Sequence, residues 1–289
     1  MSKLKKTYSK KNIISTLFKK FPDLFNTYEG NLNAVDLIKL KSKRNLVFEI
    51  IPKTQNSTRR QALVVKVFKN PTAHIEVNII NHLKQQNIPV PFIRSFEDPY
   101  LILEKIEGYN LCDFINQALS GTQTLDEITE NLRRQLSQSI HLLAQWFATL
   151  HRKNIIEFNS IENIIVLNKG NTRLRDFIIN PSTSTIYGLD FEQAYEGNYL
   201  EDLTWICCSL IDTNPGIFEL AEPSHKIELI NIFLKEYFNA NTDFLFSFHK
   251  FSKLLINNLN KVIKRRALGM GNLNLDVIFN KLFRSNSSQ

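Results

Sequence analysis

The most informative part of this sequence is residues 186–208, IYGLDFEQAYEGNYLEDLTWICC. An apolar run ends at Asp190, a Phe-Glu pair and an alanine follow, and a glycine precedes an acidic helix start that contains Asp202. An aspartate that ends a strand before an acidic helix N-terminus would explain these letters without any binding role, because carboxylates are favourable there. The order strand, Asp, Phe, Glu, Ala, Gly and Asp-Leu is more specific than that simpler interpretation requires.

Upstream, residues 151–167 read HRKNIIEFNSIENIIVL. A Leu-His pair ends a long helical pattern, and we interpret His151 as a packing residue. Asn163 begins the apolar run NIIVL, which is typical of a short strand. Between the two lies a polar turn in which Glu157 and Asn159 flank Phe158.

Residues 62–83 combine a strand pattern with a helix pattern. ALVVKVF is β-branched and apolar around Lys66, and HIEVNIINHL repeats its apolar residues at helical spacing with Glu76 in the first turn. Taken alone, these two residues could be an exposed lysine at a strand end and a glutamate that suits the helix dipole.

Two further segments flank this pair. YEGNLNAVDLIKL, residues 28–40, places Gly30 and Asn33 in a turn before Val35, and both residue types tolerate positive φ; a plain β-hairpin turn would have the same composition. YLILEKIEGYNL, residues 100–111, is an apolar strand followed by Gly108, where the chain passes into a mostly helical pattern.

In chain order these segments resemble the kinase-like superfamily, in its branch of aminoglycoside phosphotransferases and atypical small-molecule kinases. The resemblance extends from about Tyr28 to Leu210 and rests on the order of partial motifs. Only residues 191–201 separate Asp190 from Asp202, so there is no room for an A-P-E-like activation segment that docks a peptide.

The resemblance implies an α+β, two-lobed protein-kinase-like fold. We expect a basic N-terminal tail and short helix at 1–25, then a small β-rich N-lobe with one key helix at 26–106. A larger, mainly helical C-lobe that carries the catalytic-loop and metal-binding elements is expected at 107–289.

The same resemblance implies ATP as the cofactor, with Mg²⁺ or alternatively Mn²⁺. The implied metal ligands are Asn163 and Asp190, because a hard cation prefers oxygen ligands. Asp202 is expected to accept backbone N–H bonds from the catalytic loop and so to support it. The implied nucleotide-binding residues are Gly30, Asn31, Asn33, Val35, Lys66, Glu76, Glu104 and Ile106.

The catalytic loop of a kinase runs Asp, four residues, Asn. Counting back from Asn163 puts Phe158 at the aspartate position, and Phe158 cannot accept a proton. The neighbouring carboxylate, Glu157, is therefore the predicted base, and Asn163 is the second predicted catalytic residue. The predicted activity is transfer of the γ-phosphoryl group of ATP to a hydroxyl of an unidentified small molecule or protein. The alternative is a pseudokinase that binds nucleotide or only partners.

Composition sets the remaining limits. The chain of 289 residues is 43% hydrophobic and 22% charged, as in ordinary globular proteins. No apolar run reaches the roughly 20 residues of a membrane span, and the basic N-terminus has no signal-peptide core. The formal charge of +8 would also suit an anionic partner such as nucleic acid, although a solvated basic surface is the favoured explanation. The three cysteines follow no disulfide or zinc spacing, so we expect a reducing, cytoplasmic location.

Overall fold

The computed structural model describes residues 9–25, 32–42, 44–53, 62–70, 72–160, 163–212, 224–268 and 271–274. The chain divides into two compact units, of which the first comprises Met1–Lys84 and Pro91–Ile106 and the second Gln85–Val90 and Glu107–Gln289. The prediction of an α+β fold, with a β-rich first part and a mainly helical second part, is confirmed. No described helix is both long and apolar enough to cross a bilayer.

The first unit is built on a five-stranded antiparallel sheet in the order β1-β2-β3-β5-β4. Its strands are β1 (Val35–Leu40), β2 (Leu46–Pro52), β3 (Leu63–Val67), β4 (Ile93–Glu97) and β5 (Tyr100–Glu104). The single-turn helix η2 (Leu32–Ala34) precedes β1, and α4 (Ala73–Gln85) follows β3. The strands β1, β2, β3 and β5 coincide with the short apolar runs AVDLIKL, NLVFEII, ALVVKVF and YLILEKI, each of which predicts a strand. β4 was not predicted, because all of its residues are half-buried or exposed.

The short N-terminal helices belong to the core of this unit. α2 (Lys10–Lys20) begins at an N-cap, Ser9, whose side chain accepts the N–H of Asn12, and α3 (Pro22–Phe25) follows. Ile13 and Leu17 are buried in the same hydrophobic cluster as residues of β1, β2 and β3. The segment that the sequence suggested as a tail with a helix therefore supplies apolar side chains to the sheet.

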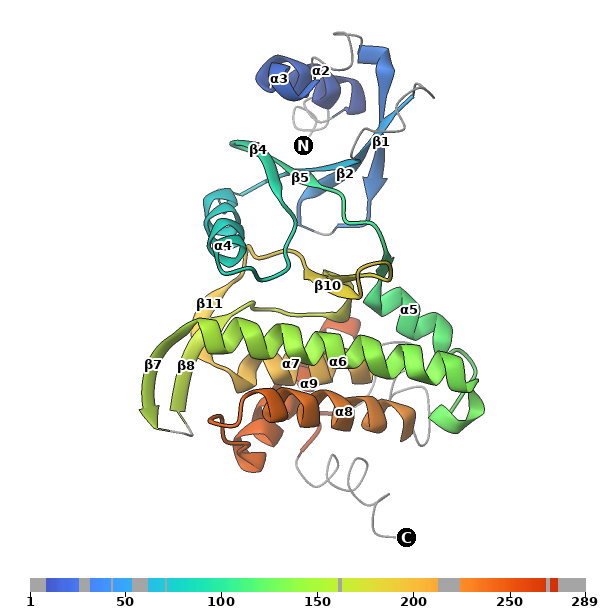
Figure 1. The fold of residues 1–289 in the computed structure, drawn as a ribbon, viewed down its shortest axis with the longest axis vertical. Coiled ribbons are helices and arrows are strands. Elements are labelled where there is room, and N and C mark those ends of the chain that lie inside the picture. The colour runs from blue at the N-terminus through green and yellow to red at the C-terminus, as the bar shows by residue number, and fades with distance from the viewer. Residues whose placement is uncertain are drawn as a thin grey trace. The chain divides into compact units, whose positions relative to one another are not determined.

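The second unit contains most of the helices (Figure 1). They are α5 (Leu111–Ala118), η3 (Leu125–Glu127), α6 (Glu130–Lys153), η4 (Leu174–Asp176), α7 (Leu200–Asp212), α8 (Ser224–Ala240) and α9 (Phe248–Arg266). α6 packs along α8, and α7 packs against α9. The core between them is rich in aromatic rings, among which Trp146 and Phe147 of α6 both lie edge-on or tilted to Phe177.

Two small antiparallel sheets accompany these helices. One has the order β10-β9-β6 and the other the order β11-β8-β7. Their strands are β6 (Tyr109–Asn110), β7 (Ile155–Ser160), β8 (Asn163–Asn168), β9 (Phe177–Asn180), β10 (Thr185–Gly188) and β11 (Tyr195–Asn198). Residues 169–176 carry the chain from β8 in one sheet to β9 in the other, so this connection joins the two sheets.

Candidate functional site

In the first unit, Lys66 and Glu76 form a buried ion pair. Lys66 lies on β3 and its Nζ donates to Oε2 of Glu76 at 2.6 Å; the two residues are 7% and 1% exposed. The interpretation of Lys66 as an exposed strand-end lysine is therefore wrong. A buried charge is tolerated only when it is paired, so this contact fixes the first turn of α4 against β3.

The other residues of this unit that were predicted to bind nucleotide do not form a single cluster of contacts among the described residues. Asn33 is exposed in η2, whereas Val35 is 2% exposed and belongs to the hydrophobic core. The N–H of Glu104 donates to the carbonyl of Phe92, and the Glu104 carboxylate accepts the N–H of Phe92 in return, both at 2.9 Å. Ile106 is buried at the end of the unit. Gly30 and Asn31 lie outside the described residues.

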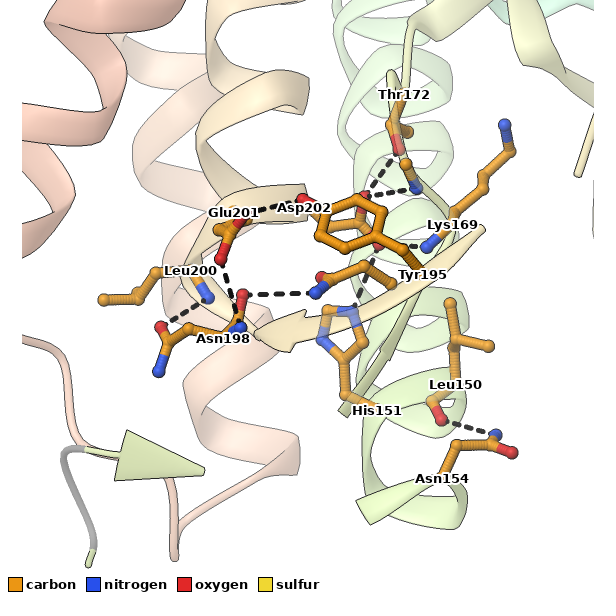
Figure 2. A network of polar contacts seen from close by, with 12 residues as sticks. Leu150, His151, Asn154, Lys169, Thr172, Tyr195, Asn198, Leu200, Glu201 and Asp202 are labelled. Atoms are coloured by element: carbon orange, nitrogen blue, oxygen red, sulfur yellow. Dashed lines mark hydrogen bonds and ion pairs between the residues drawn. The ribbon is translucent and has the colours of Figure 1, made fainter. Parts of the chain in front are cut away.

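In the second unit, the carboxylate of Asp202 is the centre of a buried polar network (Figure 2). Asp202 lies in the first turn of α7 and is fully buried. Its Oδ2 accepts the backbone N–H of Lys169 at 2.6 Å, and its Oδ1 accepts the N–H of Gly170 at 3.1 Å and the hydroxyl of Thr172 at 2.7 Å. One carboxylate therefore holds three donors of a single loop.

His151, at the end of α6, completes this network from the other side. Its Nε2 lies 3.4 Å from Oδ2 of Asp202 and its Nδ1 lies 2.9 Å from the hydroxyl of Tyr237 in α8. Because a carboxylate only accepts, Nε2 carries a proton that it donates toward Asp202, and Nδ1 is hydrogen-bonded to the tyrosine hydroxyl. His151 is thus a buried packing residue, as interpreted from the sequence, with a polar role added.

The pKa of Asp202 shows that this network favours the charged form. Burial is the largest single influence and acts to raise the pKa. The hydrogen bond and charge of His151, the hydroxyl of Thr172 and the N–H of Lys169 act in the opposite direction, and the net result is a lowered pKa. Asp202 is therefore an anion that binds the loop through charge-assisted hydrogen bonds.

The loop that Asp202 holds, residues 169–176, has an unusual backbone. Gly170 has a φ of +74°, and a Cβ on it would lie 2.0 Å from the carbonyl oxygen of Gln193. Asn171 also has a positive φ, 45°. Such conformations in non-glycine residues are uncommon and are maintained only by the surrounding structure. Here the anchors on either side of Asn171 are the contacts of Gly170 and Thr172 with Asp202.

The far end of the loop is anchored as well. The N–H of Leu174 donates to the hydroxyl oxygen of Ser209 in α7 at 3.1 Å. The side-chain amide of Asn110 donates to the carbonyl of Arg175 at 2.7 Å. The loop is therefore held along its whole length by side chains from other elements.

Asp176 ends this loop close to Asp190. β9 and β10 pair with Phe177 opposite Gly188, and the N–H of Leu189 donates to the carbonyl of Asp176 at 2.8 Å. The hairpin thus brings the residue before β9 next to the residues that follow β10. Asp190 itself has a φ of 63° and is exposed.

The electrostatics of Asp176 reflect these neighbours. Burial raises the pKa of Asp176 to about 6; the positive charge of Lys169 opposes the shift, and the negative charge of Asp190 adds to it. Lys169 is 1% exposed, and its Nζ lies 3.6 Å from Oδ2 of Asp176 and donates to the carbonyl of Asp190 at 3.2 Å. Two carboxylates and one ammonium are therefore grouped at the start and end of the β9–β10 hairpin.

Glu157 and Asn163 lie elsewhere in this unit. They are on β7 and β8, two strands of one hairpin, and both are exposed. The segment predicted as a catalytic loop is mostly strand, and Asn163 stands at the far end of β8, about 20 Å along the strand from Lys169 at 3.3 Å per residue. The backbone N–H groups that Asp202 accepts are those of Lys169 and Gly170, and not groups of the β7–β8 hairpin.

The loop at 169–176 was not predicted from the sequence, because the two residue types of the expected motif occur there in reverse order. The expected spacing is Asp, four residues, Asn, whereas Asn171 and Asp176 have the same spacing with the two residue types reversed. A signal was nevertheless available: Asp176 precedes the apolar run FIIN, and a hairpin of suitable length then leads to Asp190. The apolar strand after Asp176 and the short connection to Asp190 are therefore a more informative signal than the presence of an asparagine at position 163.

Comparison with solved structures identifies the fold. No protein-family description and no curated protein matches the sequence. Glucosamine kinase in complex with glucosamine, ADP and inorganic phosphate is similar with a TM-score of 0.55 and 12% identity, over 88% of this chain and 83% of that one. The gentamicin complex of APH(2")-IIa is similar with a TM-score of 0.53 and 12% identity, over 92% and 96% of the two chains.

The streptomycin–ATP ternary complex of APH(2")-IIa has a TM-score of 0.52 and 12% identity, over 93% of this chain and 97% of that chain. At this identity the similarity shows the fold alone. The chain has the kinase-like fold of these structures.

Proposed function

We propose that this chain, as a protein of the kinase-like fold, binds ATP with a divalent cation and transfers the γ-phosphoryl group to a hydroxyl of a small molecule. One observation carries the proposal: the loop held by Asp202 ends in a carboxylate, Asp176, that the following hairpin brings next to a second carboxylate, Asp190. Carboxylate oxygens in such a pair are the ligands that Mg²⁺ prefers.

The residues fit a divalent cation on their own chemistry. Burial is the main cause of the raised pKa of Asp176, and the negative charge of Asp190 adds to the shift. A bound cation would favour the ionised form of both carboxylates, and Asp176 and Asp190 are the residues that would hold it. When bound with ATP, Mg²⁺ or Mn²⁺ neutralises charge on the transferring phosphates. In the first unit, Lys66 is the residue proposed to contact phosphate, oriented by Glu76.

The residue at the position of the usual catalytic base is Asn171, which cannot accept a proton. Kinase-type transfer depends mainly on positioning and electrostatics, and the loss of a general base costs about 10²–10⁴ in rate. We therefore propose slow turnover in which Asn171 orients the acceptor hydroxyl by hydrogen bonding. Glu157 and Asn163 have no part in this proposal, because they lie on the β7–β8 hairpin.

Asn171 also favours a second candidate, a pseudokinase that binds nucleotide and cation without transfer. The two candidates share the metal site and differ only in turnover. A screen with hydroxyl-rich amino sugars, the class represented by glucosamine and gentamicin in the similar structures, would separate them. We also propose a reducing, cytoplasmic setting, because Cys207 and Cys208 are buried thiols whose pKa is raised by burial.

The first test is thermal unfolding with ATP, with and without Mg²⁺. A ligand at one hundred times its dissociation constant adds about 2.7 kcal/mol to stability, which raises the unfolding midpoint by about 5–10 °C in a protein of this size. We expect a Mg²⁺-dependent rise in the native protein that disappears in Asp190→Asn and Asp176→Asn. Asp243→Asn removes an exposed carboxylate from a turn and is the matched control. An equal rise in all four proteins would refute the assignment of the two carboxylates.

A further inference from the structure

Lys169 is a buried lysine in the middle of the proposed metal site. Its side chain is 1% exposed and its Nζ lies 5.7 Å from the ring centroid of Phe177 and 5.4 Å from that of Phe191. The polar contacts of the same Nζ are Oδ2 of Asp176 at 3.6 Å and the carbonyl of Asp190 at 3.2 Å. The ammonium is therefore surrounded by two aromatic faces and two oxygen atoms.

These contacts give Lys169 two possible duties that can be told apart. The hydrogen bond to the carbonyl of Asp190 is a positioning contact, which any donor of suitable length could make. The ion pair with Asp176 is a charge contact, which requires a cation. The backbone N–H of Lys169 is held by Asp202, and burial of the side chain restricts the ammonium to the neighbourhood of both partners.

We propose that the ammonium of Lys169 serves as the internal counter-ion of Asp176 and makes divalent-cation binding depend on nucleotide. This inference rests on the proposed function, because Asp176 must be a metal ligand for the competition to matter. Without nucleotide, a divalent cation would have to share Asp176 with a positive charge only a few ångströms away, which is unfavourable in a partly buried site. The phosphates of ATP bring additional negative charge, so the cation and the nucleotide would bind together.

The sign of the effect of removing the charge follows directly. A neutral side chain at position 169 would remove the ion-pair partner of Asp176. The negative charge at the site would then be less compensated, and a divalent cation would bind more tightly in the absence of nucleotide. The factor by which nucleotide increases cation affinity would then decrease. Because coupling between two ligands is reciprocal, the factor by which the cation increases nucleotide affinity would decrease equally.

The experiment is a titration of Mn²⁺, with and without a non-hydrolysable ATP analogue, followed by calorimetry and by the electron paramagnetic resonance of free Mn²⁺. Lys169→Met removes the charge and the donor, Lys169→Gln removes the charge and keeps a donor for the carbonyl of Asp190, and Lys169→Arg keeps the charge. We expect about tenfold or greater tightening of Mn²⁺ binding without nucleotide in the Met and Gln variants. The Arg variant should bind as the native protein does. Circular dichroism checks that each variant is folded.

Several results would overturn the inference. Unchanged or weaker Mn²⁺ binding in a folded Gln variant contradicts the counter-ion role. If the Met variant does not fold, tightening in the Gln variant supports the role by itself. In the native protein, the analogue must raise Mn²⁺ affinity at least about tenfold, so an uncoupled native protein contradicts the inference even if no variant folds. Absence of Mn²⁺ binding in every protein, with or without nucleotide, would refute the metal site and hence the proposed function itself.

Discussion

The carboxylate of Asp202 accepts the backbone N–H of Gly170 at 3.1 Å, across 32 residues of sequence. The contact joins the first turn of α7 to the loop between β8 and β9, and the same carboxylate accepts two more donors from that loop. The positions of Asn171 and Asp176 therefore depend on a residue that itself faces no solvent.

Replacing Asp202 by Asn should destabilise the protein strongly. The amide keeps the shape but removes the charge that His151 and the loop N–H groups face, and breaking one partner of a buried charged network costs about 3–5 kcal/mol. Urea unfolding followed by circular dichroism measures this loss. Asp243→Asn, at an exposed turn, should stay within about 0.5 kcal/mol of the native protein. A loss below about 1 kcal/mol for Asp202→Asn would contradict the importance of the network.

The contribution of Asp202 should also depend on pH. Its pKa is lowered in the folded protein, so its stabilising effect is complete above its unfolded pKa of about 3.9 and is lost as the pH falls through the folded pKa. The stability difference between the native protein and Asp202→Asn should therefore persist from pH 7 to about pH 5 and shrink below about pH 4. Urea unfolding at each pH tests this, and a difference that grows on acidification would have the wrong sign.

Gly170→Ala should be far more damaging than Gly121→Ala. Both glycines have a positive φ, +74° and +79°, so both variants incur the same backbone strain. A Cβ on Gly121 meets nothing within 4 Å, whereas one on Gly170 would lie 2.0 Å from the carbonyl oxygen of Gln193. We expect Gly170→Ala to lose at least about 2 kcal/mol more than Gly121→Ala in chemical denaturation. Equal losses would show that the loop relaxes around the methyl group.

The Lys66–Glu76 pair should behave as a coupled unit. Lys66→Met leaves the buried carboxylate of Glu76 without its cation, and we expect a loss of about 3–5 kcal/mol. Adding Glu76→Leu should restore part of that stability, because both charges are then absent. A double-mutant cycle measures the coupling, and additive losses would show that the two side chains act independently. Both double and single variants should lose affinity for ATP.

Glu157→Gln tests whether the catalytic loop is the β7–β8 hairpin, as the sequence predicts, or the loop at 169–176. Glu157 is exposed on β7, and its carboxylate accepts the side-chain amide of Asn159 at 3.1 Å. We expect unchanged Mg²⁺-dependent stabilisation by ATP, and unchanged turnover with any acceptor that is found. Asp176→Asn should abolish the metal-dependent stabilisation. The reverse result would restore the β7–β8 hairpin as the site.

Much of this fold could be predicted from the sequence, and particular residues show why. Lys66 stands in a β-branched run and Glu76 in the first turn of an amphipathic helix, so their pairing needed only the topology of a strand followed by a helix. Asp190 and Asp202 were found because a strand and a helix start surround them. These are local patterns in which the residue type and the element agree.

The loop at 169–176 could not be predicted in the same way. Its identity depends on the long-range partners of Asp202, which leave no local pattern in the sequence. The apolar run after Asp176 indicates the β9–β10 hairpin but not the loop that precedes it. The spacing Asp, four residues, Asn does not identify the loop either, because Asn171 stands where an aspartate is expected and Asp176 where an asparagine is expected. Asn163 has the expected residue type, but it lies in a β-hairpin, because it begins β8, which pairs with β7.

That hairpin has a significance of its own, since β7 is the edge of its sheet. Ile155, Ile156 and Phe158 are 40–57% exposed on it, a composition that invites pairing with strands of other molecules. The register shifts between Ile155 and Glu157 and again between Phe158 and Ser160. Such irregularities interrupt the row of backbone donors, and a charge in mid-strand repels a second copy. We therefore expect Glu157 to disfavour edge-to-edge association of two copies at β7.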